Sequence, residues 1–283
     1  MNAVEVKGLR KSYGGVEAVR GIDFELRSGE VFGLLGPNGA GKTTTVEILV
    51  GYRRRDGGEV RVLATDPERA ERAWRGRIGV VPQTGELFPN LSVIEHLELF
   101  AGYYEDPQPP REVLQLIGLE EKAGAKSRTL SGGQRRRLDL GVALVGNPEL
   151  LFLDEPTTGF DPSARRAAWE TIRSLRALGK TILLTTHYIE EAHRLADRVA
   201  VLRRGEIVAS GTPAELIAQA PATVIRYRRN GEEVVLETED PTRALHELTG
   251  EALRDGFDLA GLEVHRASLE EVYLSLTEEE PSP

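Results

Sequence analysis

The sequence predicts an α/β protein: a mostly parallel sheet with an N-terminal antiparallel β part and a helical insert, followed by a small α+β C-terminal extension. Three observations support this. Apolar runs typical of strands alternate with stretches of helical periodicity, polar residues follow several of those runs, and the composition changes near residue 221. Strands that alternate with helices pair in parallel, because each helix returns the chain to the same end of the sheet.

The N-terminal part is expected to contain strands and hairpins. The segment "VEVKGLRKSYGGVEAVRGIDFELRSGEVFGLL" mixes short apolar runs with Gly and Ser-Gly turns. Its last run, residues 31–35, leads into a glycine-rich loop, and "KTTTVEILVGYRR" then opens a helix. A further strand, "RIGVVPQ", ends at Gln83.

Helical periodicity dominates residues 88–148, as in "SVIEHLELFAGYY" and "REVLQLIGL". Strand signals return with "LLFLDEP" and "TILLTTH", and the helix "PSARRAAWETIRSLRALG" separates them. Residues 1–220 therefore read as one domain whose parallel sheet is interrupted by a helical subdomain at about 88–148.

Acidity distinguishes residues 221–283, which contain 6 Lys and Arg against 15 Asp and Glu and so carry the whole net charge of −9. This argues against a nucleic-acid partner or an anchor to anionic lipid. Asn230-Gly231 between two β-rich runs predicts a hairpin. A helix ("DPTRALHELTGEAL"), a strand ("LEVHRA") and a last helix with a Ser268–Glu271 capping box are expected to follow.

Composition excludes several kinds of chemistry. The chain has no cysteine, which excludes disulfides, thiolate metal sites and a thiol nucleophile and fits a reducing cytosol. Its N-terminus lacks the apolar core of a signal peptide, and no run approaches the roughly 18 apolar residues of a membrane span. If the protein works at a membrane, we expect another chain to do the crossing.

A phosphate-binding loop is predicted where the strand at residues 31–35 ends. The pattern G-x-x-x-x-G-K-T spans Gly36, Pro37, Asn38, Gly39, Ala40, Gly41, Lys42 and Thr43, and Thr44 follows. Its backbone N–H groups and the following helix dipole favour an anion. Lys42 would reach the β- and γ-phosphates of ATP, and Thr43 would ligate Mg²⁺. The alternative, a plain glycine turn, does not explain the strand–loop–helix context.

Polar residues at other strand ends complete a predicted active site. Asp154 would hold the Mg²⁺ shell, and Glu155 would be the base that activates water. Gln83 and His187 end further strands that point to the same edge of the sheet. Each alone has a simpler explanation: two acids at a strand end are often a solvated turn, and a single Gln or His is often surface or capping.

A second phosphate-binding pattern, "LSGGQ", begins at Leu130, and its Ser131 offers a hydroxyl beside glycine amides and a helix N-terminus. It follows the helical insert, away from the first loop. Both pockets have a use in a head-to-tail dimer in which Ser131 of each chain caps the ATP held by Lys42 of the other. Taken alone, the segment could be a flexible surface turn.

The order of these motifs, with Tyr13 before them and "TTGFD" among them, resembles the ATP-binding cassette (ABC) transporter ATPases over residues 3–218. The resemblance implies that Tyr13 stacks on adenine and that Gln83 senses Mg²⁺ and signals to a membrane partner. His187 would hold the γ-phosphate, and Asp161 would couple the two sites of a dimer. The residues implied to contact the opposite ATP are Ser131, Gly132, Gly133 and Gln134. Phe160 stands where leucine is usual in this family.

The tail, ending in "SLEEVYLSLT", resembles the C-terminal extension of the daunorubicin-resistance, drug-exporting ATPases. This implies an ATP-hydrolysing exporter subunit, a homodimer using ATP and Mg²⁺, at the cytoplasmic face of the plasma membrane beside a separate integral-membrane permease. Phe88 and Leu91 would either face that permease or lie in the core. The alternatives are a soluble ABC protein acting on ribosomes or DNA, and a regulatory cassette that binds ATP without turnover.

Overall fold

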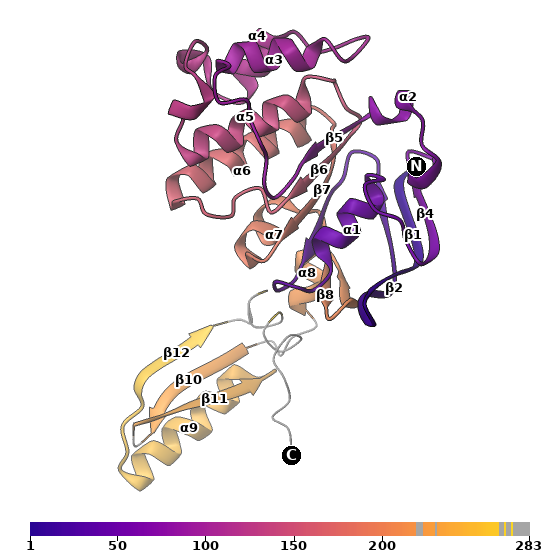
Figure 1. The fold of residues 1–283 in the computed structure, drawn as a ribbon. Helices are drawn as coiled ribbons and strands as arrows, with labels where there is room; N and C mark the ends of the chain where they lie inside the picture. The colour runs from indigo at the N-terminus through magenta and orange to yellow at the C-terminus, as the bar shows by residue number, and fades with distance from the viewer. Residues whose placement is uncertain (219–222, 230, 266–268, 270–272, 274–283) are drawn as a thin grey trace. The chain divides into compact units, whose positions relative to one another are not determined.

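The computed structural model describes residues 1–218, 223–229, 231–265, 269 and 273 (Figure 1). The chain forms two compact units, residues 1–210 and 211–283. The short helix α8 (Pro213–Ala218) is thereby grouped with the second unit, whereas the sequence placed the domain boundary after residue 220. Within the described ranges, no helix is both long and apolar enough to cross a membrane.

A six-stranded sheet in the order β5-β6-β7-β3-β8-β9 forms the centre of the first unit. Pairing is parallel from β5 through β6, β7 and β3 to β8, as predicted. The six strands are β3 (Val31–Leu35), β5 (Ile78–Val81), β6 (Leu150–Asp154), β7 (Thr181–Thr186), β8 (Arg198–Arg203) and β9 (Glu206–Gly211). Parallel pairing brings the carboxyl ends of β3, β5, β6 and β7 to one edge.

Both faces of this sheet are buried along β3, β6 and β7, which explains why these strands read as continuous apolar runs. Successive side chains of a strand point to opposite faces. Leu150 and Phe152 therefore belong to one core cluster, and Leu151 and Leu153 belong to another. The first cluster includes residues of the N-terminal strands and α1 (Lys42–Leu49), and the second includes residues of the later helices.

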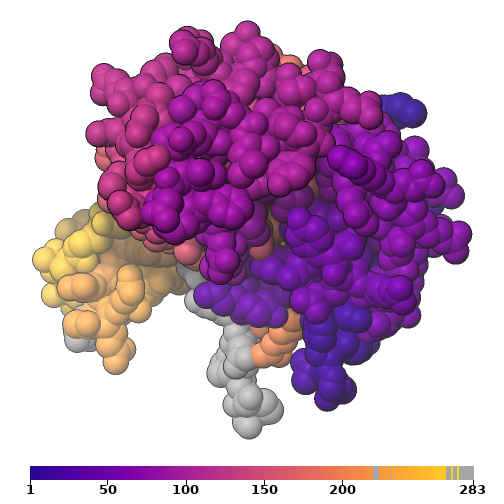
Figure 2. Space-filling model, turned by 45° about the horizontal axis from the view of Figure 1, so that its top comes forward, coloured from indigo at the N-terminus to yellow at the C-terminus, as the bar shows by residue number. Residues whose placement is uncertain are grey.

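The predicted antiparallel part is a separate three-stranded sheet in the order β2-β1-β4. Its strands are β1 (Asn2–Tyr13), β2 (Val16–Arg27) and β4 (Gly57–Val62). The short helix α2 (Arg72–Arg75) follows and anchors the chain through Trp74, whose indole N–H donates to Val62 O at 2.8 Å. Figure 2 shows these N-terminal residues, in indigo and violet, beside the magenta atoms of the helical segment.

The helical insert contains α3 (Val93–Ala101), α4 (Pro110–Leu116) and α5 (Gly132–Leu144). Capping boxes start two of these helices: Ser92 with Glu95 for α3, and Ser131 with Gln134 for α5. The "LSGGQ" segment is therefore a helix N-terminus, as predicted. Two more helices, α6 (Pro162–Ala177) and α7 (Ile189–Leu195), flank β7 in the chain.

The second unit contains an antiparallel sheet in the order β11-β10-β12 and the helix α9 (Pro241–Asp255). Its strands are β10 (Thr223–Arg229), β11 (Glu232–Thr238) and β12 (Ala260–His265). Ile225 and Tyr227 of β10 form a small core with Leu248 of α9. The antiparallel pairing of β10 and β11 fits the predicted hairpin, whose Asn230 lies outside the described residues, as does the predicted Ser268–Glu271 capping box.

Candidate active site

A glycine loop joins β3 to α1 and has no room for side chains at two positions. A Cβ atom on Gly36 would collide with Leu202 O, and one on Gly41 would collide with Ala18 O. Gly41 also has φ of 103°, a backbone conformation that favours glycine. The loop therefore packs closely against neighbouring backbone, which keeps it in the cradle shape that the sequence pattern predicts for a phosphate.

Lys42, the first residue of α1, extends back over this loop. Its Nζ donates to Gly36 O at 2.8 Å and to Pro37 O at 3.1 Å. The same Nζ lies 3.1 Å from Glu155 Oε1, and only 4% and 5% of the two side chains are exposed. An ammonium and a carboxylate thus neutralise one another where water has little access.

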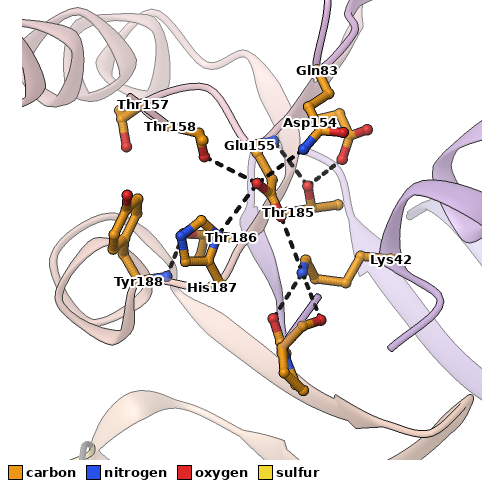
Figure 3. A network of polar contacts seen from close by, with 12 residues as sticks. Lys42, Gln83, Asp154, Glu155, Thr157, Thr158, Thr185, Thr186, His187 and Tyr188 are labelled. Atoms are coloured by element: carbon orange, nitrogen blue, oxygen red, sulfur yellow. Dashed lines mark hydrogen bonds and ion pairs between the residues drawn. The ribbon is translucent and has the colours of Figure 1, made fainter. Parts of the chain in front are cut away.

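Glu155 lies at the centre of a converging set of polar groups (Figure 3). Its Oε2 accepts hydrogen bonds from Thr158 Oγ1 at 3.0 Å and Gln83 Nε2 at 3.3 Å. His187 Nδ1 lies 3.3 Å from the same oxygen. One carboxylate oxygen therefore faces Lys42, and the other faces the ends of β5 and β7.

The electrostatics keep Glu155 ionised. Burial would raise the pKa of this carboxyl, but Lys42, Thr158 and His187 together place its pKa below the ordinary value. Its backbone is unusual as well, with φ of 48°, a left-handed conformation that a non-glycine residue adopts only when its surroundings enforce it. The Glu155 carboxylate is therefore ionised and held in a constrained position.

Asp154, one residue earlier, ends β6 and is also buried. Burial raises the pKa of Asp154, and hydrogen bonds from the hydroxyls of Thr185 and Thr43 oppose that rise. Thr185 Oγ1 donates to Asp154 Oδ1 and accepts the backbone N–H of Glu155 at 3.0 Å. Thr185 therefore fixes both acids with one hydroxyl group.

Of the predicted site residues, Lys42, Thr43, Gln83, Asp154, Glu155 and His187 lie together. The "LSGGQ" residues are not among the polar contacts of Lys42 or Glu155: Ser131 and Gln134 bond one another at an exposed helix start. Asp161 caps α6 through bonds from the backbone N–H groups of its first turn. Tyr13 is 39% exposed, and the guanidinium of Arg53 lies 5.1 Å from its ring centroid.

Sequence reasoning missed Thr158, Thr185 and the buried glutamate Glu191 of α7. Glu191 Oε1 accepts from Thr157 Oγ1 at 2.8 Å and Trp169 Nε1 at 2.9 Å, and burial raises its pKa. These contacts join the loop after Glu155 to α6 and α7. A hydroxyl inside the apolar run "TILLTT" was a usable signal for Thr185, but nothing in "IEEAHRL" marks Glu191 as buried.

Fold and site together define an ATP-hydrolysing protein of the P-loop class, with a lysine-bearing glycine loop and a buried carboxylate at neighbouring strand ends. The model of the ABC transporter family matches residues 19–158. A second model, described as the C-terminal domain of ABC transporter domain-containing proteins, matches residues 213–268. The predicted resemblance to the ABC transporter ATPases is thus confirmed, and a C-terminal domain found with such proteins matches the tail.

Similar proteins match nearly the whole chain. Nod factor export ATP-binding protein I of Ralstonia nicotianae is 42% identical over 302 residues, covering 97% of this chain and 93% of that protein. The protein of the same name from Paraburkholderia xenovorans is 42% identical over 298 residues and covers 97% of each. The chain therefore belongs to the ABC transporter family, as an ATP-binding subunit and ATPase.

Solved structures agree with this assignment. An ATP-binding subunit of an ABC transporter superposes with a TM-score of 0.71 at 26% identity, covering 98% of this chain and all of that one (100%). A dimeric ATP-binding cassette in a post-hydrolysis state, bound to ADP and phosphate, gives a TM-score of 0.67 at 27% identity, covering 74% of this chain and 98% of that one. The curated relatives are named for Nod factor export, so the drug-resistance subgroup stays a prediction.

Proposed function

We propose that this chain powers an ABC exporter by hydrolysing ATP beside a separate integral-membrane permease. The observation that carries the proposal is the buried contact of Lys42 with Glu155, at the strand edge shared with Gln83 and His187. Export as the direction of transport is supported by the names of relatives that share 42% of the sequence.

Each of the central residues has a role in hydrolysis. Lys42 exchanges its bonds to the loop carbonyls for the β- and γ-phosphate oxygens of ATP. Glu155 then accepts the proton of the attacking water. His187 lies close enough to Glu155 to hold the γ-phosphate against that water. A buried base beside a cation suits this reaction, because its charge is held in place before ATP arrives.

Thr43, Gln83 and Asp154 would hold Mg²⁺. Hydroxyl, amide and carboxylate oxygens are the hard ligands that this ion prefers, and Thr43 is already a hydrogen-bond partner of Asp154. Bound there, Mg²⁺ would neutralise charge on the phosphates. The residues present therefore fit the ion.

A head-to-tail homodimer accounts for the residues that lie apart from Lys42. In it, Ser131, Gly132, Gly133 and Gln134 contact the ATP of the other chain, Asp161 lies near the shared boundary, and Tyr13 stacks on adenine. The capping box at Ser131 engages the N–H of Gln134, so the N–H groups of Gly132 and Gly133 at the start of α5 would meet a phosphate of the other chain's ATP. A solved cassette that is 27% identical is a dimer bound to ADP and phosphate, which supports this arrangement.

The helical insert carries an exposed aromatic surface to which a permease could bind. Phe88 is 51% exposed and Tyr103 is 62% exposed. Both rings contact that of Phe100, with centroid distances of 6.5 and 6.0 Å. We propose that this surface, with the half-buried Leu91 nearby, docks the permease and holds the chain at the cytoplasmic face of the membrane. The acidic C-terminal unit supports the expectation of no nucleic-acid partner.

Co-purification tests the partner. The chain, expressed at native level and extracted in mild detergent, should bring down a polytopic membrane protein, and Phe88→Glu should reduce that capture. The matched control is Leu178→Glu, because Leu178 is also exposed (62%) and lies at the C-terminal end of α6. Recovery of ribosomes or DNA in place of a membrane protein would favour the soluble class of ABC proteins.

A further inference from the structure

Arg136 lies in the second turn of α5 and directs its guanidinium at backbone carbonyls of the active site. Its side chain is only 12% exposed. The acceptors are the carbonyl oxygens of Asp154 at 2.7 Å, Pro156 at 3.3 Å, Glu155 at 3.4 Å and Gln83 at 3.4 Å, together with that of Pro82. One side chain of the helical insert thus donates hydrogen bonds to the backbone at the carboxyl ends of both β5 and β6.

This cation is held chiefly by carbonyl dipoles. The carboxylate in its ion pair, Asp139 Oδ2, lies 3.9 Å away, one helical turn along α5. Burial lowers the pKa of Arg136, which nevertheless stays charged at neutral pH because guanidinium is so weakly acidic. A planar fork of N–H donors matches several carbonyls at once, which a lysine ammonium cannot do.

The carbonyls that Arg136 contacts surround the residue with the unusual backbone. Glu155 has φ of 48°, and its N–H is already fixed by Thr185. Arg136 binds the carbonyls before, at and after Glu155. The left-handed conformation is thereby held from both sides, and it determines where the carboxylate points.

We propose that Arg136 is a positioning residue for ATP hydrolysis. It holds the backbone from Asp154 to Pro156 so that the Glu155 carboxylate meets Lys42 and His187, and it keeps Gln83 beside that carboxylate. The inference rests on the proposed role of Glu155 as the base. Arg136 itself does not touch ATP in this account.

The first test compares Arg136→Gln, Arg136→Lys and a matched control. Arg137→Gln removes the next guanidinium of the same helix, which donates instead to Gly118 O at 2.9 Å. Because small displacements of a reacting group are costly, Arg136→Gln should lower kcat on the order of 10- to 100-fold with KM for ATP nearly unchanged. Arg136→Lys should fall between, and Arg137→Gln should match the wild type. An unchanged kcat in a folded Arg136→Lys or Arg136→Gln protein would overturn the proposal.

A double-mutant cycle with Glu155→Gln separates positioning from a general loss of structure. If Arg136 acts through the Glu155 carboxylate, Arg136→Gln should cause little further loss of single-turnover rate once that carboxylate is gone. If the two losses multiply instead, Arg136 acts elsewhere, and the proposal is wrong. Arg136→Lys serves in the same cycle if the glutamine variant does not fold. Wild-type turnover in Glu155→Gln alone would instead remove the base on which the proposal rests, so the two failures are distinguishable.

Discussion

Lys42 Nζ and Glu155 Oε1 lie 3.1 Å apart in a setting where only 4% and 5% of the two side chains are exposed. Lys42 begins α1 and Glu155 directly follows β6, so the pair joins the phosphate loop to the strand that ends in Asp154. Before ATP binds, the ammonium of Lys42 and the carboxylate of Glu155 neutralise each other.

The pair makes a prediction for stability. Lys42→Met keeps the side-chain volume but leaves the Glu155 carboxylate buried without its cation, which should lower the free energy of unfolding by about 1–3 kcal/mol at pH 7. The double variant Lys42→Met/Glu155→Gln should recover most of that loss, because no uncompensated charge remains. Urea denaturation of the wild type, Lys42→Met and the double variant measures both effects. Equal losses in Lys42→Met and the double variant would mean that the ion pair contributes nothing.

That loss should also depend on pH. In the wild type the pKa of Glu155 is lowered, so its contribution is present above the unfolded pKa and disappears as pH falls through the folded one. Lys42→Met and the wild type should therefore approach one another in stability as the pH falls below about 4, the ordinary range of a glutamate. Unfolding midpoints measured across this range test the convergence, and a constant difference would contradict it.

The contribution of Glu191 to folding stability should change with pH in the opposite direction to that of Glu155. Burial raises its pKa, so the folded chain binds a proton more tightly than the unfolded chain, and stability is lost as pH rises from the unfolded pKa through the folded one. Glu191→Gln removes this titration. Its stability relative to the wild type, measured as unfolding midpoints across this range, should increase between acid and neutral pH. A flat difference for Glu191→Gln would show that its titration has no effect on folding.

Mixing two inactive variants tests whether each ATP site is formed by both chains of the dimer. Lys42→Ala and Ser131→Arg homodimers each carry two damaged sites, whereas a head-to-tail heterodimer concentrates both lesions in one site and leaves the other intact. Mixed samples should therefore regain part of the ATPase activity.

A crosslink serves as the second measurement, since the chain has no cysteine of its own. Cysteines introduced at Gly39 and Ser131 should join the two chains when ATP is present. If mixed samples regain no activity and no intermolecular crosslink forms, the head-to-tail arrangement is ruled out.

Much of this fold could be predicted because its signals are local. Apolar runs, glycine turns and S-x-x-Q or S-x-x-E caps mark where elements begin and end, and parallel pairing then brings Gln83, Asp154 and His187 to one edge. The P-loop pattern and the motif "LLFLDEP" added Lys42 and Glu155 to the residues predicted at this edge.

What the sequence could not predict are differences between adjacent, chemically identical residues. Arg135, Arg136 and Arg137 form one run, yet only Arg136 bonds the carbonyls around Glu155. Glu190 is exposed and Glu191 is fully buried on the same helix. Which residue faces inward depends on the rotation of α5 and α7 against the sheet, and that is set by packing between distant segments.

The measurement that most directly tests the central claim is the steady-state ATPase rate of Glu155→Gln. Removing the base should reduce the rate roughly 10²–10⁴-fold. ATP binding should persist, because the glycine loop and Lys42 remain. Glu190→Gln, the exposed control, should hydrolyse ATP at the wild-type rate. A Glu155→Gln protein that binds ATP but turns it over as fast as the wild type would contradict the assignment of Glu155 as the catalytic base.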